Sequence, residues 1–166
     1  MATYKLIETQ TLTTSVASIT FSSIPQTFTD LKLVFSGRTS AGTLTLGNAS
    51  FNGSTLNFTS RYLEGTGTTA GSFTDQPRVI TAASGSSATA SVFGSCELYI
   101  PNYTSSAYKS YSADIVGENN ATESYQVMFA GLWSDTSAIT EIAFTAQSSR
   151  TYNQYSSASL YGIKNS

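Results

Sequence analysis

Apolar and polar residues alternate along much of the chain, which is the spacing of a strand with one buried face. Two segments carry apolar residues at every second position, Leu31, Leu33 and Phe35 in one and Tyr111, Ala113 and Ile115 in the other. No segment shows sustained apolar residues at the spacing of a helix. The pattern therefore predicts an all-β protein.

Further short apolar segments are separated by Gly, Ser, Thr and Asn, residues that favour turns. Pro25 predicts a turn because it has no amide hydrogen for a sheet. Asn52–Gly53 predicts a tight hairpin turn because both residues accept positive backbone angles. Residues 65–73 and 81–89 are rich in small residues and are predicted as surface loops. About nine to eleven strands remain, which predicts an antiparallel, jelly-roll-like β-sandwich with residues 1–166 as a single domain.

The segment 125–144 is the predicted centre of the core. It contains two apolar strands separated by a polar corner at residues 134–137, a pattern that we interpret as a hairpin. Trp133, the only tryptophan, closes the first strand. Because it is the largest side chain beside an apolar run, we expect it to be buried and packed by Phe129 or Phe144. These three residues are the candidate core anchors.

Charge and composition limit the classes of partner that the sequence predicts. Charged residues are 11% of the chain and the net charge is −2, well below the usual quarter of residues. Ser and Thr make up roughly a third of the chain. Without a basic field, nucleic acid and anionic membranes are not predicted as partners. No run approaches the roughly 20 apolar residues of a membrane helix.

The chain offers little for catalysis. Histidine is absent, which removes the usual general base near neutral pH and the common metal ligand. Cys96 is the only cysteine, and its apolar surroundings predict a buried thiol. Glu118 and Glu123 flank one turn and could form a carboxylate pair of the kind used in glycoside hydrolysis, but we interpret them as solvated loop acids. No catalytic residue, metal site or cofactor is predicted.

Several tyrosines lie in or beside the predicted loops and are candidate contact residues. A tyrosine joins an apolar face to a polar tip, which suits binding to a sugar or to another protein. The alternative is packing at strand ends with the hydroxyl at the surface. The candidates are Tyr103, Tyr108, Tyr152 and Tyr155.

Four segments resemble a family of small virion structural proteins of tailed bacteriophages, called decoration or fibre-like proteins. They are residues 19–31 (ITFSSIPQTFTDL), residues 51–53 (FNG), residues 130–133 (AGLW) with the following 138–140 (AIT), and residues 154–163 (QYSSASLYGI). The resemblance spans nearly the whole chain, and none of the segments is catalytic.

This resemblance implies a non-enzymatic protein of the virion surface, assembled in the host cytoplasm. It implies a capsid decoration or cement protein, or a short head fibre, with the major capsid protein or other virion proteins as partners. It also implies a homo-oligomer, with a trimer favoured by analogy with jelly-roll proteins. The alternative is a receptor-binding or glycan-binding module at the tip of a tail fibre.

Overall fold

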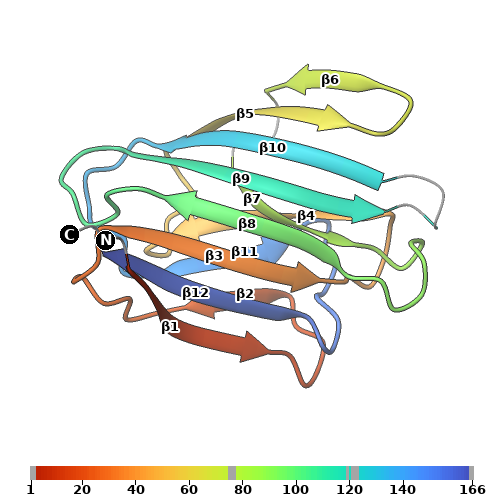
Figure 1. Cartoon of the computed structure of the whole chain (residues 1–166), viewed down its shortest axis with the longest axis horizontal. Helices are drawn as coiled ribbons and strands as arrows, with labels where there is room; N and C mark the ends of the chain where they lie inside the picture. Colours follow the sequence, from red (N-terminus) through yellow and green to blue (C-terminus); the bar gives the residue numbers. More distant parts are fainter. Residues whose placement is uncertain (1–2, 75–77, 119, 121–123, 165–166) are drawn as a thin grey trace.

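The chain folds as an antiparallel β-sandwich, seen in a computed structural model that describes residues 3–74, 78–118, 120 and 124–164. Twelve strands form two sheets and these residues contain no helix, which confirms the predicted all-β class (Figure 1). The strand count exceeds the predicted nine to eleven. The strands are β1 (Thr3–Thr11), β2 (Ser18–Phe21), β3 (Asp30–Gly37), β4 (Leu44–Phe51), β5 (Phe58–Gly65), β6 (Ala70–Phe73), β7 (Val79–Ser84), β8 (Gly94–Ile100), β9 (Lys109–Glu118), β10 (Ser124–Trp133), β11 (Ile142–Ala146) and β12 (Ser157–Lys164).

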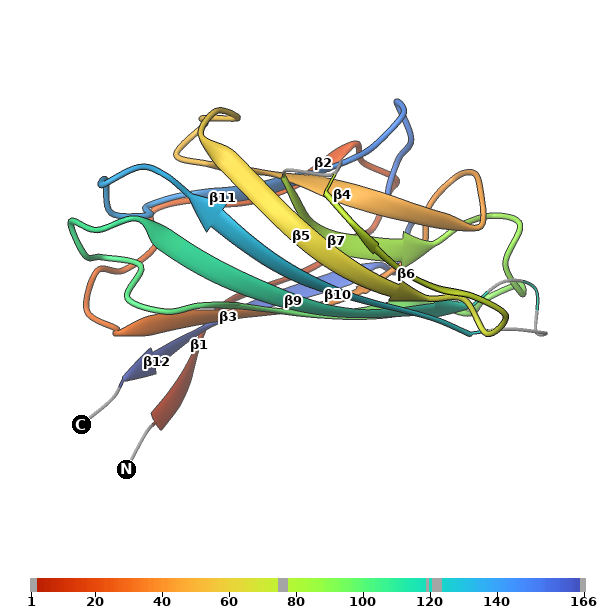
Figure 2. The same ribbon diagram turned by 90° about the horizontal axis from the view of Figure 1, so that it is seen from above.

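The two sheets differ in width. The larger has eight strands in the order β1-β12-β3-β8-β9-β10-β5-β6, and the smaller has four in the order β2-β11-β4-β7. Figure 2 shows the two layers, with the ends of β1 and β12 that carry the termini diverging from the smaller sheet. Because the smaller sheet is half as many strands wide, it covers only part of the larger one.

The register of the larger sheet shows which residues of each strand face the smaller sheet and which face outward. Leu33 of β3 lies opposite Leu98 of β8, and both are buried against the smaller sheet. The neighbouring pair, Lys32 and Tyr99, points to the other side because successive residues of a strand face opposite ways. The alternation seen in the sequence is thus the alternation between core and surface.

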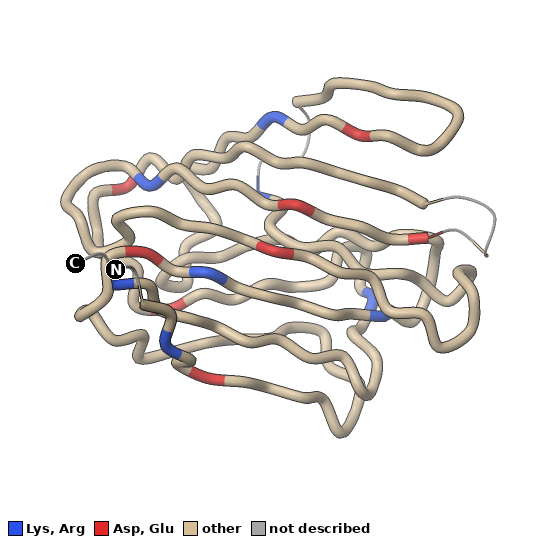
Figure 3. The backbone as a smooth tube through the Cα atoms, viewed as in Figure 1, with Lys and Arg blue, Asp and Glu red and all other residues tan. Residues whose placement is uncertain are grey.

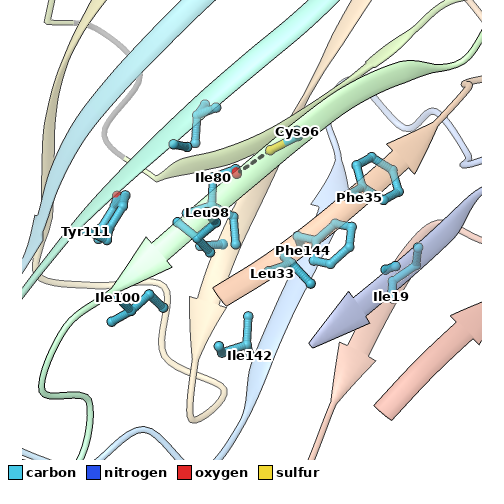
Figure 4. Packing of buried hydrophobic residues seen from close by; sticks show 14 of the residues in the cluster. Ile19, Leu33, Phe35, Ile80, Cys96, Leu98, Ile100, Tyr111, Ile142 and Phe144 are labelled. Atoms are coloured by element: carbon cyan, nitrogen blue, oxygen red, sulfur yellow. Dashed lines mark hydrogen bonds between the residues drawn. The ribbon is translucent and has the colours of Figure 1, made fainter. Parts of the chain in front are cut away.

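The core is one cluster of buried apolar residues shared by both sheets. Phe35 of the larger sheet meets Phe144 of the smaller sheet edge to face, with ring centroids 5.1 Å apart (Figure 4). Trp133, Phe129 and Phe144 are all buried, as predicted for core anchors. Trp133 has other ring neighbours than predicted, because Phe51 lies 5.4 Å and Phe58 6.2 Å from it, centroid to centroid.

The predicted hairpin over residues 125–144 is wrong. β10 pairs with β9 and β5 in the larger sheet, whereas β11 pairs with β2 and β4 in the smaller one. Residues 134–141 therefore carry the chain from one layer to the other. The Ile139 amide donates to the Tyr103 carbonyl oxygen at 2.9 Å along this crossing. Alternation in the sequence shows which residues of a strand are buried, but it does not show which of the two sheets the strand joins.

Both predicted small-residue loops contain strands. Residues 65–73 include β6, an edge strand, and residues 81–89 include most of β7. All six residues of β7 are buried, so the strand shows no alternation. Its small side chains fit where the layers come close, since a Cβ added to Gly94 would lie 3.0 Å from the Ser84 nitrogen.

The predicted turn at Asn52–Gly53 is confirmed. Both residues have positive φ, 53° and 73°, and Phe51 and Ser54 exchange two backbone hydrogen bonds across the turn. The Asn52 side chain also reaches the layer crossing. Its oxygen accepts from the amides of Thr140 and Glu141, at 2.8 and 3.1 Å. The turn therefore also anchors the segment that precedes β11.

Candidate functional site

Two of the four candidate contact tyrosines lie at the surface and two lie in the core. Tyr108 is 60% exposed and Tyr155 is 69% exposed. Tyr103 and Tyr152 are fully buried, so the prediction that they form a contact surface is wrong for both. Loop position alone does not give exposure, because these two loop residues turn their rings into the sandwich.

The buried tyrosines have polar partners for their hydroxyls. The Tyr103 hydroxyl donates to the carbonyl oxygen of Pro25. The Tyr152 hydroxyl lies 3.5 Å from the Thr81 hydroxyl, and its ring packs edge to face on Phe35 at 5.2 Å. Burial raises the pKa of both phenols. Their role is to fill the core while satisfying a buried oxygen.

The structure describes only Glu118 of the two carboxylates considered for glycoside hydrolysis. Glu118 accepts from the Thr89 amide at 2.5 Å and from the Thr89 hydroxyl at 3.0 Å, which ties the end of β9 to the preceding loop. Glu123 lies outside the described residues. Within the described ranges, no group of three or more acidic or cysteine residues could hold a metal ion.

The outer face of the larger sheet gathers most of the exposed apolar side chains. We define the outer face as the outward-pointing residues of β1, β12, β3, β8, β9, β10 and β5. Of the eleven large apolar residues exposed in the described part of the chain, six belong to it: Tyr4, Leu6, Leu63, Tyr99, Val116 and Met128. Such a concentration on one side of a molecule is typical of an interaction surface.

A shallow depression of about 270 Å³ lies near the middle of the outer face. Its lining combines tyrosine rings with charged groups, and includes Tyr4, Lys32, Glu97, Tyr99, Asp114 and Met128. The Lys32 ammonium lies 2.8 Å from the Glu97 carboxylate. Glu97 is directly opposite Asp114 in the register of β8 and β9, so two carboxylates share one end of the depression.

Tyr99 is held in place by a neighbour under the rim of the depression. Its hydroxyl donates to Asp30 at 2.8 Å, and Asp30 also accepts from the Asn102 amide at 2.9 Å. Desolvation and the hydrogen bond to Asp30 raise the pKa of Tyr99 to about 12. The phenol therefore stays neutral at physiological pH and offers a fixed, partly exposed ring.

A second depression, of about 300 Å³, lies beside the first and is more apolar. Leu63 of β5 and Met128 of β10 are directly opposite each other there, with Ala130 and Arg61 as the next opposite pair. Leu63 is 57% exposed and Met128 52% exposed. Charged residues are sparse along the part of the chain that the structure describes (Figure 3). Arg61 is the one charged residue in the lining of the second depression, so a partner can cover this part of the face with little charge to desolvate.

The sequence patterns above do not predict the outer face as a contact surface. A signal for it was present, because Tyr99 and Met128 stand in the polar phase of otherwise regular strands. One large apolar residue in the outward phase is ordinary, whereas several on neighbouring strands indicate an exposed apolar patch.

No protein-family model, curated protein or solved structure matches the chain. In the ranges that the structure describes, no helix has the length and hydropathy to cross a membrane.

Proposed function

We propose that this protein is a non-enzymatic structural protein on the virion surface of a tailed bacteriophage, assembled in the host cytoplasm. It decorates or cements the capsid and contacts the major capsid protein, or another virion protein, through the outer face of its larger sheet. The observation that carries the proposal is the gathering of exposed apolar side chains on that face. Its likeness to small phage virion proteins in sequence supports the same role.

The chemistry of the outer face suits permanent contact with a protein. A stable interface combines an apolar centre with a polar rim and few charges at its core. Leu63 and Met128 offer such a centre, and hydroxyl groups such as Ser112 and Ser72 adjoin it. The charged side chains beside this centre are Arg61, Asp114 and the paired Lys32 and Glu97, and the Lys32–Glu97 ion pair offsets part of the cost of removing charge from water.

The strand order supports the jelly-roll topology that virion proteins frequently use. In a jelly roll of eight strands lettered B to I along the chain, one sheet has the order B-I-D-G and the other C-H-E-F. The smaller sheet, β2-β11-β4-β7, follows the first order when β2 is strand B and β11 is strand I. The larger sheet follows the second order when β3 is strand C, β8 is H, β5 is E and β6 is F. The hairpin β9-β10 is then an insertion between H and E, and β1 and β12 extend the sheet beyond C.

The test is the number of copies on the particle. Quantitative mass spectrometry of purified particles should find the chain in a fixed, high ratio to the shell protein, and cryo-electron microscopy should place it on the outside of the shell. Absence from the particle, or a ratio of only a few copies per particle, would overturn the decoration role.

The depression favours a second candidate, a receptor-binding or glycan-binding module at a tail-fibre tip. Tyr4 and Tyr99 offer rings for stacking on a sugar, and Glu97 and Asp114 can accept hydrogen bonds from sugar hydroxyls. This candidate predicts a few copies per particle and binding of the isolated protein to host cells. Both readouts separate it from the decoration role.

A further inference from the structure

We propose that two copies of this chain pair edge to edge through β1, as antiparallel strands related by a two-fold axis. In this arrangement Lys5 of each copy lies opposite Glu8 of the other. This self-association does not depend on the docking of the protein on a particle.

The first observation is that β1 is a long edge strand. It is the outermost strand of the larger sheet and pairs only with β12 in the described part of the chain. Residues 3–6 are exposed on both sides of the sheet because this end of β1 extends beyond the smaller sheet (Figure 2). The strand is nine residues long. Long exposed edges readily accept another strand, because their outward backbone groups have no partner in the sheet.

The second observation is that a β-bulge makes the edge self-complementary in charge. Residues three apart in a regular strand face opposite sides, so Lys5 and Glu8 would normally point apart. The register of β1 shifts between Leu6 and Glu8, however, and Lys5 lies opposite Gly162 while Glu8 lies opposite Leu160. Since those two β12 residues are two apart, Lys5 and Glu8 are on the same face.

The third observation is that one antiparallel register matches the charges of β1, which lie on the inward-facing side of the strand opposite Gly162 and Leu160. When two copies of β1 run antiparallel with Lys5 opposite Glu8, Tyr4 comes opposite Thr9, and both of these lie on the outer face. The two-fold axis makes each pair twice, as an isologous interface requires. Pairing with Lys5 opposite Lys5 would instead place like charges together, which destabilises a ladder. Lys5 therefore disfavours the register that places it opposite Lys5 of the other copy and favours the one that places it opposite Glu8.

The surroundings favour a second copy over an unrelated strand. Tyr4 is 59% exposed and Leu6 is 50% exposed, and pairing would cover part of both. Lys5 has no ion-pair partner among the residues that the structure describes, and Glu8 accepts one hydrogen bond, from Gln10 at 2.8 Å. With a net charge of −2 per chain, two copies repel each other little. The pair would present both outer faces on the same side, since a two-fold axis between antiparallel strands is perpendicular to the sheet.

Charge reversal on the full chain tests the pairing, with sedimentation equilibrium or light scattering as the measurement. The wild type should show twice the mass of the 17.6 kDa chain. Lys5→Glu and Glu8→Lys each place like charges opposite one another at two positions, and each should raise the dimer Kd at least about tenfold. The double variant Lys5→Glu/Glu8→Lys restores both pairs and should return the Kd to within about threefold of wild type.

Lys164→Glu is the matched control, because it makes the same charge change on an exposed residue of β12, one strand in from the edge. It should leave the dimer unchanged. A wild type that stays monomeric at high concentration would overturn the proposal, as would a trimer, which a two-fold pairing cannot give. A dimer that tolerates both single reversals, or is not rescued by the double variant, would overturn pairing through β1.

Discussion

Lys109 and Trp133 lie directly opposite each other where β9 and β10 meet the end of the sandwich, and both are buried to 1% exposure. The Lys109 ammonium lies 5.8 Å from the centre of the Trp133 ring. It also donates to the carbonyl oxygens of Ala107 at 2.6 Å and Asp135 at 3.4 Å. Burial lowers the pKa of this lysine. The aromatic face and the carbonyl oxygens together make a buried cation tolerable.

Trp133→Ala should lower the free energy of unfolding by about 3 to 5 kcal/mol. The substitution removes the ring that packs on both Phe51 and Phe58 and also the aromatic face beside Lys109. Urea denaturation measures the change. Tyr108→Ala is the control, because that ring is 60% exposed and its loss should cost about 0.5 kcal/mol or less. Equal losses for the two variants would contradict burial of Trp133.

Stability should fall as the pH rises above about 10. The pKa of the buried phenols Tyr111 and Tyr152 is raised by desolvation, so the folded state holds protons that the unfolded chain releases. Their stabilising contribution is complete below the unfolded pKa and is lost as the pH rises toward the folded one. Each phenol contributes a slope of up to about 1.4 kcal/mol per pH unit.

Tyr152→Phe isolates one of these contributions. The variant keeps the ring against Phe35 and Phe144 and removes the titrating hydroxyl. Melting temperatures between pH 9 and 12 should therefore fall less steeply for the variant than for the wild type. Identical pH profiles would show that Tyr152 does not contribute.

Cys96 should be inert to thiol reagents in the folded protein. The side chain is 1% exposed and its sulfur donates to the Ile80 carbonyl oxygen at 3.3 Å, while desolvation raises the thiol pKa to about 12. Reaction at pH 8 should be at least about a thousandfold slower than in urea, because it needs unfolding, which costs a typical native domain about 5 kcal/mol or more. A rapid reaction of the native protein would contradict the burial, which the sequence had predicted.

Asn52→Ala should destabilise the protein more than Asn52→Gly. Both substitutions remove the hydrogen bonds to the amides of Thr140 and Glu141, at a cost of about 1 to 3 kcal/mol. Gly keeps the positive φ of 53° without strain, whereas Ala adds about 1 kcal/mol. Denaturant titrations of the two variants measure the difference, and equal stability would show that the backbone angle does not matter.

The sequence was sufficient for the local structure and insufficient for the pairing of the strands. Alternation identified β3 and β9, and Asn52–Gly53 identified a turn, because both features are set by neighbouring residues. The assignment of β10 and β11 to one hairpin failed because residues 134–141 can cross between sheets as easily as they can reverse direction. Which sheet a strand joins depends on contacts with distant segments.

The candidate site was predicted poorly for a related reason. The place of Tyr103 and Tyr152 in loops predicts exposure, yet both loops fold over the core and bury the two rings. The bulge in β1, which brings Lys5 and Glu8 to one face, has no signature in the residue types and follows from pairing with β12. The outer face needed the register of seven strands before its scattered apolar residues could be seen as one surface.

Binding of purified variants to particles that lack the protein tests the docking surface most directly. Met128→Glu and Leu63→Glu each place a charge in the apolar centre of the outer face, on side chains exposed enough for the fold to tolerate the change. Leu56→Glu makes the same change on a residue that is 70% exposed and lies outside that face. We predict that the first two variants keep their melting temperature and lose at least about tenfold in particle affinity, while Leu56→Glu binds like wild type. Full binding by Met128→Glu and Leu63→Glu would contradict this prediction.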